Sequence, residues 1–350
     1  MQDINILLRP SSLLLLLAVF CLSYVLTRMV RGYALAGNLM DVPNERSSHT
    51  APTPRGGGVA IVLSFLLGLL LSWCLGLLGG WQTLGFLVAG GLVAVVGFVD
   101  DHRHIPARWR LLGHFAAAAA LLWAFNGLPP LPFAGTSWNL GLLGHLLALF
   151  YLVWLLNLYN FMDGIDGIAS LEAITVCFGA ALCSWLAGQV AASWLPVLLS
   201  MATLGFLLWN YPPAKIFMGD AGSGFLGLVL GGLSLQAAWA MPQLFWCWLI
   251  LLGVFVVDAT WTLFQRLLRG ERLYEAHRSH GYQRAARLIG AHRGVSLSVA
   301  AINLFWLLPI AILVSLERVD GVIGLIVAYA PLVLLAVYLG AGRPENSTAR

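Results

Sequence analysis

Long apolar runs, separated by short polar segments, make up most of this chain. A helix needs about 20 apolar residues to cross the hydrocarbon core of a membrane. Only α-helices and closed β-barrels satisfy their backbone groups in lipid, and these runs are too long and too evenly apolar for barrel strands. The pattern therefore predicts an all-α, polytopic transmembrane helix bundle of about 11 spans. The expected spans cover residues 11–28, 57–77, 80–99, 110–126, 140–160, 166–187, 190–209, 222–240, 243–264, 296–315 and 321–339.

The composition excludes an ordinary soluble domain. Hydrophobic residues make up 60% of the 350 residues and charged residues only 10%, with a mean hydropathy of +0.85. A soluble domain carries about 25% charged residues. The five cysteines lie in apolar runs without metal-ligand spacing, which is typical of small core residues. We expect one transmembrane domain over residues 1–340 and a polar tail over residues 341–350, with membrane lipid but no nucleic acid as a partner.

The distribution of lysine and arginine predicts the orientation of the bundle, because basic residues concentrate in cytoplasmic loops. With the N-terminus outside, all 19 Lys and Arg residues except Arg9 and Arg318 fall on the cytoplasmic side. Residues near the end of a span are counted here with the adjoining loop. The opposite orientation would leave nearly all of these basic residues outside, so we reject it.

Acidic residues gather on the same predicted face, whereas the external loops are short or carry no charge. A channel or transporter more often places ionisable groups near the membrane midplane. The pattern therefore favours chemistry at the cytoplasmic ends of the helices. The aspartates concerned are Asp41, Asp100, Asp101, Asp163, Asp166 and Asp220.

The segment from Asn157 to Gly167 concentrates polar side chains at the end of a long apolar run. Asn157, Asn160 and Asp163 recur every third residue, so on a helix they share roughly one face. Asp166 follows within the next turn. Such acceptor oxygens at a membrane edge suit a hard cation or a polar headgroup. The plainer alternative is a helix cap and turn, where Asp and Gly are common.

Two further acidic positions lie at span ends. Asp100 and Asp101 are adjacent, and neighbouring carboxylates repel each other unless a cation intervenes. That cation is either a divalent metal or a nearby arginine, Arg103 or Arg108. Asp220 lies between glycines at the start of another span, where an aspartate is also a normal N-cap.

Two loops are candidates for binding anions. Arg55 precedes three glycines, and a glycine-rich approach to a helix offers backbone N–H groups and a positive dipole end. The loop 265–294 is strongly basic and contains His277-Arg278-Ser279-His280, which suits a diphosphate. The alternatives are a flexible juxtamembrane segment for the first loop and attraction to anionic lipid for the second.

Two carboxylates, Glu172 and Asp258, lie inside apolar runs near the inner ends of their spans. Intramembrane carboxylates are usually functional. The alternative for Asp258 is a structural ion pair with Arg266. We expect His114 and His145 to be satisfied residues of the bundle rather than ligands.

In this order, the polar motifs resemble those of the polyprenyl-phosphate N-acetylhexosamine-1-phosphate transferase family, glycosyltransferase family 4. The resemblance covers Asp41 to about Gly294, and the two central motifs are specific in combination. The matching motifs are Asp41 with Arg55-Gly-Gly-Gly, Asp100-Asp101, Asn157-x-x-Asn160-x-x-Asp163-Gly-x-Asp166-Gly, Phe217-Met-Gly-Asp220-x-Gly-Ser223 and His277-Arg-Ser-His280.

Two departures from the family pattern bear on the substrate. His104 stands where many members have a third acid, and His277-Arg-Ser-His280 replaces a run of three histidines or His-x-His-His. The last loop is where specificity within the family is thought to vary, so the departure leaves the identity of the sugar open. Eleven spans with the N-terminus outside look more like the O-antigen-initiating branch, the undecaprenyl-phosphate GlcNAc-1-phosphate transferases.

The resemblance implies a reaction. A HexNAc-1-phosphate passes from UDP-N-acetylhexosamine to undecaprenyl phosphate, UMP is released, and the product carries the first sugar of a glycan such as O-antigen or lipopolysaccharide. The resemblance also implies Mg²⁺, with Mn²⁺ as the alternative, a bacterial inner (cytoplasmic) membrane location, a periplasmic N-terminus and a possible homodimer. The competing hypotheses are a transporter or flippase of a lipid-linked anionic sugar and a non-catalytic scaffold.

The chemistry of such a transfer suggests roles for these residues. A phosphate monoester is largely dianionic at neutral pH, so catalysis is mostly neutralisation and positioning. Asp220 is the expected metal ligand, assisted by Asp101 or Asp163, and Asp100 is expected to orient or deprotonate the lipid phosphate. A covalent aspartyl route stays the alternative. The other expected roles are nucleoside or metal-shell contacts for Asp166 and Asn160, stabilisation of leaving UMP by His277, Arg278 and His280, and substrate binding by Asp41, Arg55 and Asn157.

Overall fold

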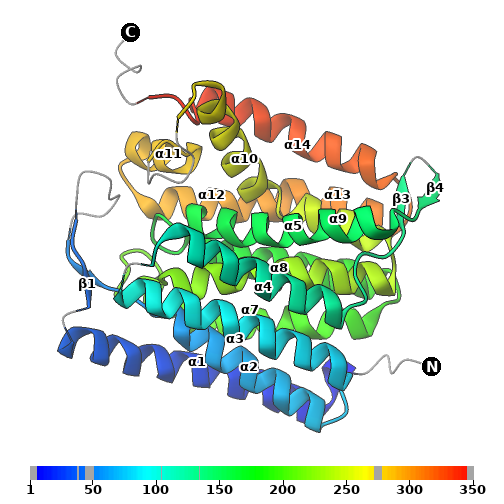
Figure 1. The fold of residues 1–350 in the computed structure, drawn as a ribbon, viewed down its shortest axis with the longest axis horizontal. Coiled ribbons are helices and arrows are strands. Elements are labelled where there is room, and N and C mark those ends of the chain that lie inside the picture. The colour runs from blue at the N-terminus through cyan, green and yellow to red at the C-terminus, as the bar shows by residue number, and fades with distance from the viewer. Residues whose placement is uncertain are drawn as a thin grey trace.

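The computed structural model describes residues 6–37, 39–43, 51–103, 105–133, 135–271 and 278–344. The chain forms a bundle of helices that lie side by side and run back and forth between two ends (Figure 1). Within the described residues, β-structure is limited to two short antiparallel hairpins. The all-α membrane fold expected from the sequence is therefore confirmed.

Each expected span coincides with one helix or with helices that follow one another. Among the described residues, 8 helices are long and apolar enough to cross a membrane, or 9 spans if the bent pair α9–α10 counts as one. The total of eleven and the orientation stay predictions. The α-helices are α1 Pro10–Ala36, α2 Gly58–Cys74, α3 Gly80–His102, α4 Ala107–Ala124, α5 Gly141–Met162, α6 Ile168–Leu186, α7 Trp194–Asn210, α8 Asp220–Ala240, α9 Gln243–Leu251, α10 Gly253–Leu268, α11 Gly281–Ile289, α12 His292–Ile302, α13 Leu308–Ser315 and α14 Gly321–Tyr338. Short 3₁₀ segments cover Ile6–Leu8 and Val190–Ser193, and a π-helical segment, Asn303–Leu307, joins α12 to α13.

The pair α9–α10 corrects one expectation from the sequence. A single continuous span was predicted over residues 243–264, but the two helices meet at an angle of 69°. Figure 1 shows α10 leaving the common direction of the bundle and running toward α11. The break lies at Leu252, and a Cβ added at the next residue, Gly253, would lie 3.0 Å from the Tyr329 ring. The small residue therefore lets the bend pack closely against α14.

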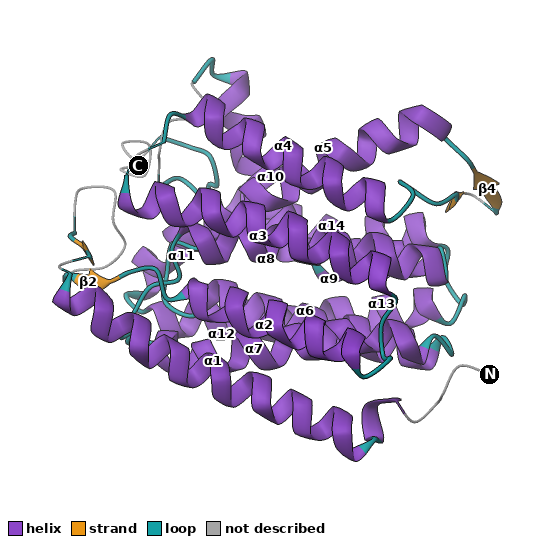
Figure 2. Cartoon of the chain, turned by 60° about the horizontal axis from the view of Figure 1, so that its bottom comes forward, coloured by secondary structure: helices purple, strands orange, loops and turns teal. Residues whose placement is uncertain are grey.

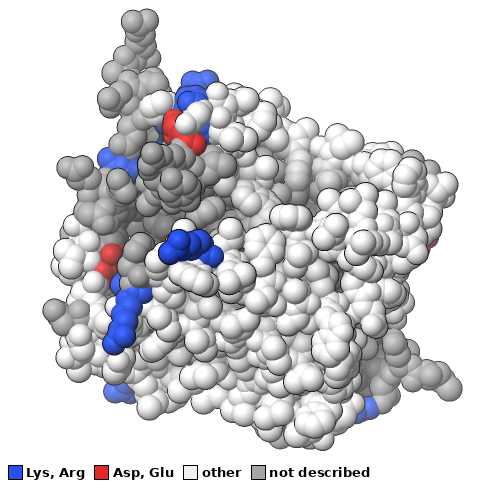
Figure 3. Space-filling view, viewed as in Figure 1, with Lys and Arg blue, Asp and Glu red and all other residues white. Residues whose placement is uncertain are grey.

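The two ends of the bundle differ in chemistry. The hairpin β1–β2 (Met40–Asp41 and Thr53–Pro54) lies at the end that carries α11, and the hairpin β3–β4 (Leu131–Phe133 and Thr136–Trp138) lies at the opposite end (Figure 1). On the face shown in Figure 3, charged side chains gather mainly at the end that carries β1 and α11. The site is therefore to be sought at that end.

Helix α8 forms the centre of the bundle, and it packs against α2, α3, α5 and α9 (Figure 2). A Cβ at Gly227 would come within 2.6 Å of the Leu155 carbonyl oxygen on α5. A Cβ at Gly222 would come within 2.6 Å of the Cα of Gly58 on α2. Small residues allow such close helix contacts in membranes, where apolar surface gives little drive for association. The helix that begins with Asp220 is therefore held firmly in place.

The segment that follows α14 folds back onto the start of α11. Gly340 and Gly342 adopt positive φ angles of 69° and 80°, which glycine allows without strain. The Gly342 N–H donates to the Ser279 carbonyl at 2.8 Å, and Arg269 donates to the Gly342 carbonyl. Arg284, which is 6% exposed, donates to the carbonyls of Arg343 and Pro344. We call these contacts of residues 340–344 the C-terminal clasp; it lies beyond the domain boundary expected at residue 340.

Candidate active site

Asp220 begins α8 at the charged end of the bundle, directly after Gly219, whose φ is 78°. Asn160, on the last turn of α5, donates from Nδ2 to Asp220 Oδ1 at 2.9 Å. The same nitrogen lies 2.9 Å from the Ser223 hydroxyl. The Asp220 side chain is nevertheless 37% exposed. Its carboxylate is thus held from one side and open to a ligand from the other.

Asp101 stabilises the first turn of α8. Its carboxylate accepts the backbone N–H groups of Asp220 at 3.2 Å and Ala221 at 3.4 Å. A carboxylate at the positive end of a helix is favourable. Arg55 donates to the Asp101 carbonyl oxygen, and the Asp101 residue is only 6% exposed. Asp101 therefore joins α3 to the exposed Asp220, and its expected part in metal binding stays a prediction.

Asp100 is neutralised by an arginine that the sequence analysis did not choose. Arg110 Nη1 lies 2.6 Å from Asp100 Oδ2 and 3.6 Å from Asp220 Oδ2. The expected partners were Arg103 and Arg108, but Arg108 instead lies over its neighbour Trp109, and Arg110 is the residue whose side chain reaches the carboxylates. The backbone N–H of Ile105 adds a 2.8 Å bond to Asp100 Oδ1.

Asp163 lies at the C-terminal cap of α5, just outside the span. Burial raises the pKa of the Asp163 carboxyl well above its ordinary value. The negative charges of Asp220 and Asp101 raise this pKa further, and Asp166 acts in the same direction. Asp100, Asp101, Asp163 and Asp220 thus share one electrostatic environment, which we call the carboxylate cluster. Such crowding is relieved when a cation binds.

The donor set of the carboxylate cluster fits Mg²⁺ better than a metal that needs an all-protein cage. Among the described residues, no group of three or more His, Cys, Asp or Glu side chains is placed to hold a metal ion. Mg²⁺ usually takes one or two carboxylates and completes its shell with water and substrate phosphates. Asp220, whose side chain is 37% exposed, can supply one such carboxylate, and Asp163 or Asp101 would supply the second.

The glycine-rich segment before α2 has a different role from the one expected. Gly57 N–H donates to the Phe217 carbonyl at 2.9 Å, and Gly58 N–H donates to the Met218 carbonyl at 2.8 Å. These N–H groups are therefore not directed at a phosphate, and that expectation is corrected. A Cβ at Gly58 would lie 2.4 Å from the Cα of Gly222. The glycines let α2 approach the start of α8 closely.

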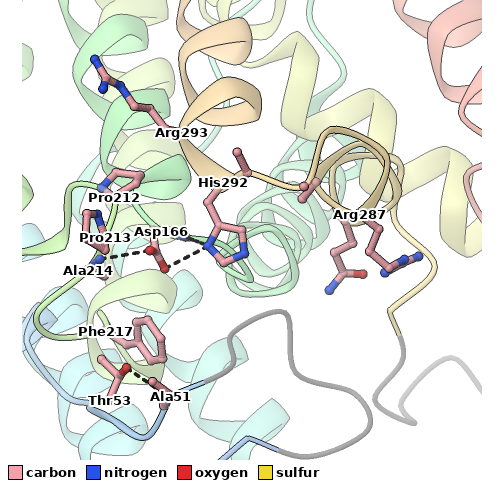
Figure 4. Close-up of a pocket in the computed structure, with 14 residues that line it drawn as sticks. Ala51, Thr53, Asp166, Pro212, Pro213, Ala214, Phe217, Arg287, His292 and Arg293 are labelled. Atoms are coloured by element: carbon pink, nitrogen blue, oxygen red, sulfur yellow. Dashed lines mark hydrogen bonds and ion pairs between the residues drawn. The ribbon is translucent and has the colours of Figure 1, made fainter.

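A cavity of about 710 Å³ is lined by the segments that follow α5 and α7 and by the start of α12 (Figure 4). Asp166 points into it and accepts the Ala214 N–H at 3.0 Å, while His292 Nδ1 lies 3.2 Å from Asp166 Oδ1. Because two arginines line this cavity, we call it the basic cavity. The residues lining it include Thr53, Asp166, Pro212, Ala214, Phe217, Gln283, Arg287, His292 and Arg293.

His280 lies apart from these contacts, in the first turn of α11. Its residue is 2% exposed, and its Nδ1 is 3.5 Å from Asp258 Oδ1. Asp258 also accepts the N–H groups of Gly281 and Tyr282, each at 2.8 Å. The alternative considered for Asp258, a structural ion pair with Arg266, is therefore wrong.

The correct partner of Arg266 is Glu271, at 2.8 Å. Arg269 lies 2.7 Å from the other oxygen of Glu271, so both arginines belong to the structure of the loop rather than to Asp258.

The remaining candidates have mixed placements. Asn157 lines a narrow recess together with Asn160, Arg110 and Asp220, although its amide donates to the Val153 carbonyl.

Asp41 belongs to β1. The Arg278 carbonyl accepts from Arg287 at 3.1 Å. His277 lies outside the described residues. The catalytic and binding roles given to all these residues stay predictions.

Sequence reasoning missed two residues that stand out in the structure, Arg110 and His292. Each lies in the first turn of a helix. The sequence alone does not show which loops meet, so it does not indicate that these two side chains reach the aspartates. His145 agrees with the sequence analysis, because it accepts the Leu128 N–H at 3.0 Å at the opposite end of the bundle. His114 does not, because it lines the same recess as Arg110 and Asp220 and its buried Nδ1 has no hydrogen-bond partner among the described residues.

Comparison with known proteins identifies relatives that match most of the chain. Residues 83–238 match the family model of glycosyl transferase family 4. A probable undecaprenyl-phosphate N-acetylglucosaminyl 1-phosphate transferase of Bacillus subtilis is 29% identical over 83% of this chain and 82% of that protein. A decaprenyl-phosphate N-acetylglucosaminephosphotransferase of Mycolicibacterium smegmatis is 30% identical over 81% of this chain and 80% of that protein.

A more distant function occurs among the relatives too. A phospho-N-acetylmuramoyl-pentapeptide-transferase of Moorella thermoacetica is 32% identical over 66% of this chain and 75% of that protein. Together with the apolar helices, these relatives make the chain a multi-pass protein of the bacterial inner (cytoplasmic) membrane. The motifs, the fold and the relatives agree, and the chain belongs to the polyprenyl-phosphate N-acetylhexosamine-1-phosphate transferase family, glycosyl transferase family 4.

Proposed function

We propose that this protein transfers a HexNAc-1-phosphate from a UDP-N-acetylhexosamine to undecaprenyl phosphate, releases UMP and depends on Mg²⁺. The observation that carries the proposal is the convergence of the carboxylate cluster from α3, the end of α5 and the start of α8, next to the basic cavity. These elements are far apart in the sequence but meet at one end of the bundle. The relatives named above support a polyprenyl phosphate as the acceptor.

The arrangement suits a reaction between two anions. The acceptor phosphate monoester is largely dianionic at neutral pH, so it needs orientation and charge neutralisation more than deprotonation. Bound to Asp220 and Asp163, Mg²⁺ would neutralise and polarise the diphosphate of the donor. Arg110 holds Asp100 beside Asp220, and Asn160 fixes the rotamer of Asp220. The protein thereby orders the ligands of the site before the substrates arrive.

The basic cavity is the natural place for the nucleotide end of the donor. Phe217 and Thr53 offer an aromatic and a hydroxyl surface, and Arg287 and Arg293 offer positive charge. Phe217 lies three residues before Asp220, so a nucleotide in the cavity would present its diphosphate toward the carboxylate cluster. We further propose that the product begins a cell-surface glycan such as O-antigen, and that a homodimer is the working form.

Purified protein in lipid nanodiscs, supplied with undecaprenyl phosphate and a panel of UDP-N-acetylhexosamines, tests the proposal through release of UMP. We expect turnover with at least one donor, loss of turnover in EDTA and recovery with Mg²⁺ or Mn²⁺. Asp220→Asn should lower kcat by more than about a hundredfold. The matched control is Asp320→Asn at the start of α14, since asparagine also caps helices. Movement of a lipid-linked sugar without UMP release would replace the proposal with a transporter.

A further inference from the structure

Asp166 is fixed by an unusual number of contacts for a residue on a loop. Its Oδ2 accepts the Ala214 N–H at 3.0 Å, and its Oδ1 lies 3.2 Å from His292 Nδ1. The Asp166 backbone N–H also lies 3.4 Å from His292 Nδ1, and its carbonyl accepts the Ser296 hydroxyl at 2.8 Å. His292 and Ser296 both belong to the first turns of α12. This helix therefore determines where the Asp166 carboxylate points.

A second set of contacts, at the other end of α12, joins this helix to α6. Asn303 donates from Nδ2 to Glu172 Oε2 at 2.7 Å and to the Thr175 hydroxyl at 2.8 Å. Glu172 and Asn303 are fully buried, and Asn303 opens the π-helical segment after α12. From His292 to Asn303 the helix rises roughly 16 Å. Contacts at both ends of α12 resist tilting of the helix, so His292 stays opposite Asp166.

The Asp166 carboxylate is held from the protein side and faces the basic cavity. Its Oδ2 accepts the Ala214 N–H, and its Oδ1 lies beside His292 Nδ1. The Asp166 side chain is 13% exposed and points into the basic cavity (Figure 4). An acceptor oxygen held in this way can bind N–H or O–H groups of a nucleotide, while Arg287 and Arg293 are the cationic residues among those that line the same cavity.

We propose that His292 is a positioning residue for the nucleotide end of the donor, because it holds the Asp166 carboxylate in its binding orientation. The inference rests on the proposed function and deepens it. His292 contacts Asp166 rather than the carboxylate cluster, so its loss acts on donor binding more than on the chemical step. His292→Ala should raise KM for the nucleotide sugar about tenfold and change kcat by less than about threefold.

Two conservative variants separate positioning from general structural support. In asparagine, a polar side-chain atom bonded to Cγ can replace Nδ1, whereas glutamine places its amide one carbon further, close to the position of Nε2. Because Nδ1 is the atom that contacts Asp166, His292→Asn should restore KM to within about threefold of the unaltered protein, and His292→Gln should not. If His292 only filled space, the KM values of the asparagine and glutamine variants would not differ in this way.

The experiment measures kcat and KM for the donor, with UMP release as readout and the full-length protein in nanodiscs. His145→Ala is the matched control, because His145 also uses Nδ1 to contact a backbone N–H but lies at the opposite end of the bundle. The melting temperature of each variant without substrate is measured in parallel. If His292→Ala lowers the melting temperature, the KM values of the asparagine and glutamine variants decide between a positioning role and general structural support. Equal KM values for these two variants, or a fall confined to kcat, would overturn the inference.

Failure of the inference is distinguishable from failure of the proposed function. If the unaltered protein releases no UMP with any donor while it remains folded, the proposed function is wrong. If it turns over and Asp220→Asn does not, but His292→Ala keeps the unaltered KM, only the role of His292 is wrong. A raised KM in His145→Ala as well would show a general loss of packing and would also reject the specific role.

Discussion

Arg110 forms a 2.6 Å ion pair with Asp100, and the same guanidinium nitrogen lies 3.6 Å from Asp220. One cation from the first turn of α4 thereby joins the last turn of α3 to the first residue of α8. Asp100 is almost fully buried at its side chain, whereas Asp220 is exposed. The pair thus keeps one carboxylate neutralised and leaves the other within reach of a ligand.

Arg110→Gln should lower kcat about tenfold to a hundredfold, because a hydrogen bond to a charged group is worth about 1.5–3 kcal/mol. Asp100 would then be buried without its cation, and its carboxylate would repel Asp220. The measurement is kcat at saturating donor and acceptor. Arg108→Gln, two residues away on the same helix, is the control, because Arg108 lies over Trp109. Equal losses in both variants would show that only the overall charge matters.

Gly58→Ala should destabilise the protein by about 1–3 kcal/mol and displace the start of α8. The new Cβ would lie 2.4 Å from the Cα of Gly222, and a backbone atom cannot move aside as the end of a side chain can. Melting temperature in detergent measures the effect.

The control for that variant is Gly91→Ala on α3, where nothing lies within 4 Å of an added Cβ. Alanine favours helices over glycine by about 1 kcal/mol, so this variant should keep or raise the melting temperature. If Gly58→Ala melts at the same temperature as Gly91→Ala, the close approach of α2 and α8 is not what positions Asp220.

Tyr282→Phe should weaken the link between α11 and the end of α5. The Tyr282 hydroxyl donates to the Phe161 carbonyl at 3.0 Å, two residues before Asp163. Its loss removes one neutral hydrogen bond, worth about 0.5–1.5 kcal/mol, and should lower kcat about threefold to tenfold. Tyr338→Phe, an exposed residue at the end of α14, is the control. An unchanged kcat in Tyr282→Phe would show that this contact between α11 and α5 does not affect catalysis.

Deleting residues 340–350 should abolish or strongly reduce activity, because the C-terminal clasp holds the start of α11. Without the clasp, buried Arg284 would lose the carbonyls of Arg343 and Pro344, and a lost hydrogen bond to a charged group costs about 1.5–3 kcal/mol. UMP release and melting temperature are the measurements. Deleting residues 345–350 retains every contact of the clasp and should leave both values unchanged. If both deletions behave alike, the clasp has no role.

The sequence predicted much of the fold because span length and charge bias are imposed by the membrane itself. Residues 222–240 read as one span and form one helix, since nothing interrupts the apolar run. The bend at Leu252 was missed, because neither proline nor a polar residue marks it, and the close approach of Gly253 to Tyr329 is visible only in the folded chain. The rule that fixes a span's length says nothing about its curvature.

For the candidate site, too, one part could be predicted from the sequence and another part could not. The aspartates of the carboxylate cluster could be found because charged groups at the end of an apolar run have few structural reasons to be there. Their partners could not be assigned. For Asp258 the structural partner considered was Arg266, eight residues later, but Asp258 contacts the start of α11. Asp166 meets His292 across more than a hundred residues. Pairing between distant segments depends on how the helices pack, which one sequence does not state.

The C-terminal clasp has a consequence for how the protein is made. Residues 340–344 leave the ribosome only after every helix from α1 to α14 has been synthesised. The loop that carries His280 therefore lacks this support until α14 has been made. A nascent chain stalled before that point would hold its aspartates in the membrane without a finished enzyme around them.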